Sequence, residues 1–146
     1  MATVEAHLRQ WARNRAFLQT IDGEYVDWQV TVAFYVALHA VDALLTADGA
    51  RERSSHQHRN EILQREQRYQ KIFKHFRNLY DLAHQTRYAA DSSRWIPAHD
   101  VQKRVIEERL FPIESSVRKL LAERKPPIPM AAHEPLRVKG PKTLPA

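Results

Sequence analysis

The sequence predicts an all-α protein, an up-and-down bundle of four to five helices. Glycine occurs only three times in 146 residues, and the segments between turn residues are rich in good helix formers. Apolar residues recur at spacings of three and four in every long segment, which is the period of a helix buried on one side. A chain of this length can build one sizeable core. We therefore expect one helical domain over residues 1–125.

The first two helices are bounded by clear signals. Residues 4–21 carry the helical period, with Thr3 placed to cap their first turn and Gly23 to end it. The second helix is predicted over residues 28–47, with Asp48 and Gly49 as its terminator. It is apolar on nearly every side, so it belongs in the middle of the bundle.

The third and fourth helices follow a polar loop at residues 50–54. Either Ser54 or Ser55 can cap the third helix, and a weak break is expected at residues 64–67. The fourth helix then runs to Tyr88. It buries an apolar stripe at helical spacing, made of Tyr69, Ile72, Phe76, Leu79 and Ala83.

The fifth helix and the end of the chain differ sharply in composition. Asp100 is expected to cap a helix over residues 101–124, and Pro112 should kink this helix or split it. Six of the eight prolines then fall in residues 126–146, where no period survives. We expect this basic, proline-rich tail to be extended, and either disordered or bound to a partner protein.

Composition excludes several classes of function. The absence of cysteine rules out disulfides and thiolate metal sites. Lys and Arg exceed Asp and Glu by 23 to 17, and the net charge of +6 fits either phosphate or nucleic acid partners or a solvated, salt-bridged helical surface. The richest apolar run, residues 30–45, is shorter than the roughly 20 residues that span a membrane. Since no targeting signal is visible either, we expect a cytoplasmic protein with no membrane partner.

The second helix carries one polar stripe. At about 100° per residue, six side chains fall within about 80° of one another. They are Trp28, Thr31, Tyr35, His39, Asp42 and Thr46. Such a stripe must be hydrogen-bonded inside the core or open onto a site.

Small and aromatic residues recur in and after this helix in a recognisable order. The pattern is Phe34-Tyr35-x-Ala37-x-His39-x-x-x-Ala43-x-Leu45, then Ser55-His56, Leu79-x-x-Leu82 and Arg87-Tyr88. Over residues 26–122 it resembles the HEPN superfamily of prokaryotic helical domains. The resemblance implies a four- to five-helix bundle, commonly a homodimer. Many relatives are metal-independent ribonucleases of toxin–antitoxin, CRISPR-linked or anti-phage defence systems, and others are non-catalytic binding modules.

Catalytic relatives carry an arginine and a histidine separated by four to six residues, often with a polar residue after the arginine. Six pairs in this chain have that spacing, so helical geometry is the better filter. Arg77, followed by Asn78, and His84 lie about 20° apart on one helix face. Arg77 is the candidate for phosphate charge and His84 for proton transfer. Asp81 shares this face, and the alternative is an exposed Arg77–Asp81 ion pair.

A second constellation competes with this pair. It consists of Tyr35, His39, Asp42, His56, Arg59, Arg87 and Tyr88. These residues would form an acid–base and phosphate site if the second and third helices bring them together. The alternative is a buried polar network, with Asp42 paired to arginine, that sets the register of the bundle.

Two functions follow from these candidates. The first is a metal-independent endoribonuclease, a toxin or defence component that acts on RNA as a homodimer. The second is a non-catalytic module that binds a protein or RNA partner through the bundle and tail. Neither requires a cofactor, and the histidine spacings do not favour a metal site.

Overall fold

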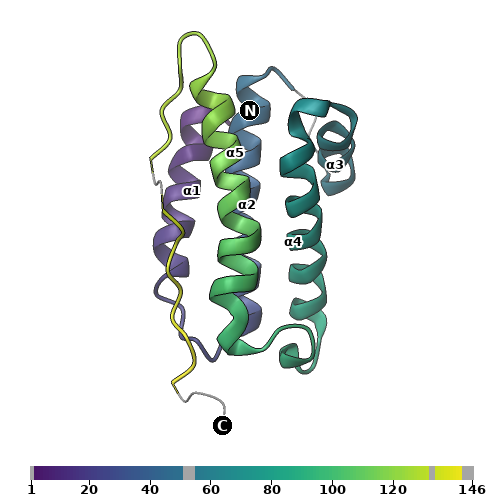
Figure 1. Cartoon of the computed structure of the whole chain (residues 1–146), viewed down its shortest axis with the longest axis vertical. Helices are drawn as coiled ribbons and strands as arrows, with labels where there is room; N and C mark the ends of the chain where they lie inside the picture. Colours follow the sequence, from purple (N-terminus) through teal and green to yellow (C-terminus); the bar gives the residue numbers. More distant parts are fainter. Residues whose placement is uncertain (1, 51–54, 132–133, 143–146) are drawn as a thin grey trace.

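The fold is an all-α bundle, as the sequence predicts (Figure 1). The computed structural model describes residues 2–50, 55–131 and 134–142. Four long helical segments run side by side in alternating directions, and a short helix lies against one flank. The α-helices are α1 (Val4–Leu18), α2 (Val26–Ala47), α3 (His56–Arg65), α4 (Gln70–Tyr88) and α5 (Phe111–Ala122). Short helical turns join them: η1 (Gln67–Tyr69), η2 (Ser92–Arg94) and η3 (Ala98–Asp100), while η4 (Val101–Leu110) is a wider π-helical segment.

Helix α2 is the centre of the bundle. It contacts α1, α4, α5 and η4, and its Val, Ala and Leu side chains are almost all buried. Among the described residues, α2 is the one helix long and apolar enough to span a membrane. The sequence analysis had considered only the shorter run at residues 30–45. Most of the apolar surface of α2 is buried inside the bundle. This burial is the physical reason for its composition.

Several helix boundaries follow the predicted capping signals. The Thr3 hydroxyl accepts a hydrogen bond from the amide of Ala6 at 3.1 Å, and the Ser55 hydroxyl accepts one from His58 at 3.1 Å. Gly49 ends α2 with a φ of 82°, in the left-handed region that favours glycine. The alternative cap Ser54 and most of the polar loop lie outside the described residues.

Helix α1 ends earlier than expected. The sequence predicted that it would run through residue 21 to a stop at Gly23, but it ends at Leu18. Gly23 has another role, because a Cβ at this position would lie 2.0 Å from the carbonyl oxygen of Gly140 in the tail. The missing side chain therefore makes room for a segment more than a hundred residues away.

The fifth helix changes its winding between Leu110 and Phe111, just before Pro112, where the sequence predicted a kink or a split. Its first part, η4, is wound as a π-helix, and the amide of Phe111 still bonds the carbonyl of Ile106, five residues earlier. Pro112 lies in the first turn of α5, and because it has no N–H it cannot continue the hydrogen bonds of η4. Asp100 stands at the expected start, but its side chain forms no cap. It instead forms an ion pair with Arg104 at 3.7 Å.

The proline-rich tail is extended, and its described part lies against its own bundle alongside α1 (Figure 1). The sequence left this tail disordered or bound to a partner. In the structure Met130 and Leu136 are buried. Both polar atoms of the Gln102 side chain form hydrogen bonds with the backbone of the tail. Gln102 donates to the carbonyl of Leu136 at 2.8 Å and accepts from the amide of Val138 at 2.9 Å. Burial of the two apolar side chains, Met130 and Leu136, thus attaches the tail to the surface of the bundle.

Candidate functional site

Arg77 and His84, the predicted catalytic pair, are both exposed on α4. The Nε of Arg77 lies 3.4 Å from a carboxylate oxygen of Asp81, and these two side chains are 52% and 47% exposed. Within the described residues, no hydrogen bond or ion pair joins Arg77 to His84. An exposed pair four residues apart contributes little to stability, so Arg77 can exchange Asp81 for another anion.

His84 belongs instead to a row of rings along α4. Its ring lies 4.9 Å from that of Tyr88 and 6.4 Å from that of Tyr80, each one helical turn away. Tyr80 in turn meets His56 of α3 at 5.0 Å and Phe34 of α2 at 5.6 Å. We call these five side chains the ring row. Three helices therefore contribute to one aromatic surface that ends in exposed Tyr88.

Two further predicted residues of α4 lie apart from each other. The guanidinium of Arg87 lies 5.3 Å from the centre of the Tyr88 ring, so a cation stands at the end of the ring row. Asn78 lies on another flank, where it lines a hollow of about 310 Å³ together with Trp95. The polar residue after Arg77 is therefore directed away from the ring row.

Asp42 and Arg59 form a buried ion pair between α2 and α3. Both side chains of this pair are almost completely buried, at 9% exposure for Asp42 and 8% for Arg59. Arg59 donates from Nε to Oδ1 of Asp42 at 2.8 Å and from Nη2 to Oδ2 at 3.2 Å. This geometry is the predicted polar network that holds two helices in register.

His56 lies beside this pair and is oriented by it. Its Nδ1 is 3.4 Å from Nη1 of Arg59. Because a guanidinium can only donate, Nδ1 acts as the acceptor and Nε2 carries the proton. Although the residue is solvent-accessible, Phe34 and Tyr80 cover part of its ring. This partial burial, followed by the charges of Arg59 and Arg87, lowers the pKa of His56.

His39 is half-buried and faces a histidine that the sequence analysis did not select. Its Nδ1 lies 3.3 Å from Nδ1 of His7 on α1. Burial is the largest cause that lowers the pKa of His39, and His7 adds to it, while Asp42 acts in the opposite direction. One of the two facing nitrogens must carry a proton for a hydrogen bond to form. The two facing Nδ1 atoms therefore hold one proton between them. A proton on both atoms would place two N–H groups against each other, and they would repel.

The structure thus joins some of the predicted residues and separates others. Asp42, Arg59 and His56 form a chain of contacts from α2 to α3, and the ring row continues it to His84. His39 lies on the same stripe as Asp42 and contacts His7 of α1. Tyr35 is 39% exposed on α2, and its ring lies 5.7 Å from that of Phe34 at the edge of the ring row. Sequence analysis missed Tyr80, although its spacing of four residues from His84 was a usable signal. No local signal pointed to His7.

No metal centre is apparent at this site. Among the described residues, no group of three or more His, Asp or Glu side chains is arranged to hold a metal ion. The polar groups available at the ring row are imidazole, guanidinium and phenol. They can stack on planar rings, bind anions and transfer protons.

Comparison of this chain with family models, curated proteins and solved structures finds no match.

Proposed function

We propose that this chain is a metal-independent endoribonuclease of the HEPN type, which binds single-stranded RNA along the ring row and acts as a homodimer. The observation that carries the proposal is the surface formed by half-buried Tyr80 and exposed His84 and Tyr88, with Arg87 at its end. Aromatic side chains bind unpaired bases by stacking, at about 1–3 kcal/mol per base. An adjacent guanidinium suits the phosphate that links those bases.

The same surface has the groups that strand cleavage by a ribose 2′-hydroxyl requires. One group must remove the hydroxyl proton, another must protonate the leaving oxygen, and a cation must stabilise the charge on phosphate. His84 is our candidate for proton transfer, since its ring nitrogens make no hydrogen bond within the described chain. Arg77 and Arg87 are the candidate cations on the same helix. His56 would donate from Nε2 to a phosphate oxygen.

Exposed aromatic side chains of α2 support the homodimer. Trp28 and Tyr35 of α2 are 57% and 39% exposed, unusual values for large aromatic residues. A second copy that covered them would bring two ring rows together and supply two histidines to one RNA strand. Sedimentation of Trp28→Lys against wild type tests this part, with a shift toward monomer expected for the variant.

A non-catalytic binding module is the alternative function. The buried Asp42–Arg59 pair favours it, since these two charged groups are bound to each other and closed to a substrate. The Arg77–Asp81 contact favours it as well. In this case the ring row would hold RNA or a protein partner and leave it intact.

One experiment separates the two functions. Purified protein is incubated in EDTA with total RNA and with a labelled single strand, beside Arg77→Ala, His84→Ala and the double variant. His99→Ala, which changes an exposed histidine on η3, is the matched control. We expect cleavage by wild type and by the control, and its loss in the variants of Arg77 and His84. Intact RNA after incubation with folded, dimeric wild type would refute the ribonuclease and favour the binding module.

A further inference from the structure

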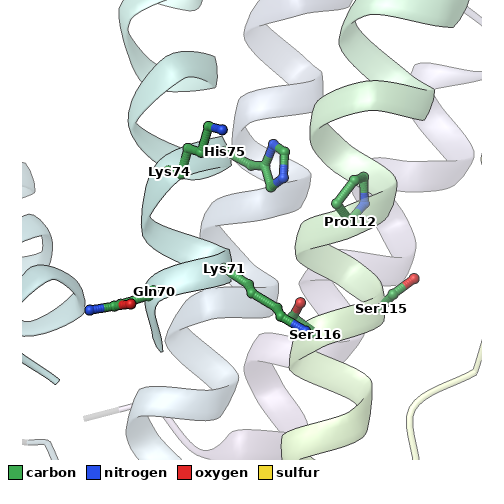
Figure 2. Close-up of a pocket in the computed structure, with 7 residues that line it drawn as sticks. All are labelled: Gln70, Lys71, Lys74, His75, Pro112, Ser115 and Ser116. Carbon is green, nitrogen blue, oxygen red and sulfur yellow. The ribbon is translucent and has the colours of Figure 1, made fainter. Parts of the chain in front are cut away.

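A groove separates α4 from α5 on the flank of α4 away from the ring row. It contains a hollow of about 420 Å³, drawn in Figure 2, and a neighbouring hollow of about 360 Å³ that shares Lys71, Ser115 and Ser116 with the first. Figure 2 shows the Lys71 side chain extending from α4 toward Ser116 on α5. We call these two joined hollows the basic groove.

Several cationic and hydrogen-bonding residues are among those that line the basic groove, although most of its surface is apolar. The first hollow is lined by Lys71, Lys74, His75 and two serines, and no carboxylate is among its lining residues. The second hollow adds further cations, with Glu123 as its one acidic lining residue. The cations of the second hollow are Lys71, Lys119 and Arg68, the last of which is already paired with Asp48 at 3.3 Å. A concave surface with this excess of cations attracts anions.

His75 strengthens the donor character of the groove. Its Nδ1 lies 3.2 Å from Nη1 of Arg109, and because arginine only donates, Nδ1 accepts and Nε2 carries the proton. Burial, followed by the charges of Arg109 and Lys74, lowers the pKa of His75, so the ring stays neutral near pH 7. It is therefore a neutral donor within a group of cations.

The spacing along the groove suits a chain of phosphates better than a single anion. Lys71 and Lys74 are separated by about 4.5 Å along the axis of α4, at 1.5 Å per residue. Arg68 lies one turn before Lys71, and the two hollows follow each other lengthwise. The groove therefore presents cations at successive helical turns.

We propose that the basic groove binds the phosphate backbone of single-stranded RNA, as a second contact surface apart from the ring row. This inference rests on the proposed function only for the identity of the polymer. Lys71 and Lys74 neutralise phosphates, while His75 and the two serines donate hydrogen bonds to phosphate oxygens. A strand bound here is held against α4 without contact between the groove and the bases, so the groove adds affinity independent of sequence.

The test measures RNA binding as a function of salt concentration. Fluorescence anisotropy with a 2′-O-methyl oligonucleotide, which lacks the reactive hydroxyl, is recorded for wild type and for Lys71→Ala/Lys74→Ala. The control is Lys103→Ala/Lys125→Ala, which removes the same charge from exposed sites outside the groove. Each phosphate contact on a single strand contributes about 0.7 to the slope of log K against log salt. We expect the groove variant to lose about 1.4 of that slope, and the control to keep the wild-type value.

The outcomes separate this inference from the proposed function. Equal slopes for the two double variants would overturn the groove, because only net charge would then matter. Competition by inorganic triphosphate as strong as by the oligonucleotide, with no dependence on strand length, would also overturn it and indicate a small-anion site. Loss of slope in a protein that leaves natural RNA intact would support the groove while refuting the ribonuclease.

Discussion

The replacement of Asp42 by asparagine is the most direct test of how the candidate site is built. Asparagine keeps the shape of the side chain and removes the charge that Arg59 faces at 2.8 and 3.2 Å. Both residues are more than 90% buried, so the guanidinium would remain in the core without a counter-charge. Breaking such a pair costs about 3–5 kcal/mol. For a chain of this size, about 2–4 °C per kcal/mol translates this into a Tm lowered by about 10 °C.

Thermal unfolding followed by circular dichroism measures this effect. Arg77→Ala is the matched control, because it breaks an exposed pair on α4 whose contribution is at most about 1 kcal/mol. The double replacement Asp42→Leu/Arg59→Met removes both charges at similar volume. We expect it to recover most of the lost stability, since apolar substitutes for buried ion pairs are often neutral or stabilising.

Two results would refute this reasoning. A Tm for Asp42→Asn within about 2 °C of wild type would place the carboxylate in a solvated cleft, where its charge is dispensable for folding. If the double variant is less stable than Asp42→Asn, then the ion pair stabilises the fold by more than the neutralisation of two buried charges. Either result would mean that Asp42 and Arg59 are again candidates for direct contact with a substrate.

Two further predictions follow from the histidines and from the tail. The pKa values of His39, His56 and His75 are lowered by folding, so below their ordinary value near 6.5 the unfolded chain binds more protons than the folded one. The free energy of unfolding should therefore fall as pH is reduced from 7.5 to 5.5, and His39→Gln should reduce this dependence in thermal unfolding. Gly23→Ala should displace the tail and destabilise the protein by about 1–3 kcal/mol, since its Cβ would overlap the Gly140 backbone. Hydrogen exchange at the amide of Val138, which donates to Gln102, should then become faster.

Each of these predictions has its own control. Stability that rises as pH falls through this range would contradict the assigned pKa directions. For the tail, Gly140→Ala is the matched substitution, because a Cβ at Gly140 meets nothing within 4 Å. Equal exchange of the Val138 amide in the two glycine variants would mean that the tail does not depend on its close approach to Gly23.

The helices were largely predictable because their signals are local. The stripe from Tyr69 to Ala83 is buried as its spacing required, and the caps at Thr3 and Ser55 form the expected hydrogen bonds. The end of α1 was predicted wrongly at residue 21. Glycine usually marks a helix end, but Gly23 instead leaves room for the backbone of Gly140. The local sequence does not reveal this contact.

The candidate site was predictable only in part. The helical period correctly grouped Asp42 with His39 on one stripe, and Tyr80, His84 and Tyr88 follow the same rule on α4. Whether a polar stripe becomes a buried network or an open site depends on which helix packs over it. The helical repeat of the sequence does not contain that information. Arg59 pairs with Asp42 and buries it, so the exposed part of the candidate site consists of the rings of α4.

The sequence by itself determined the all-α class, the central position of α2, the caps at Thr3 and Ser55 and the extended tail, because each depends on residues within a few turns. Tertiary structure alone decided that His7 faces His39, that Arg59 neutralises Asp42 and that Gln102 holds the tail. These partners are 17 to 36 residues apart in the chain. Their pairing is set by how apolar faces pack against one another, which brings polar groups together as a consequence of burial.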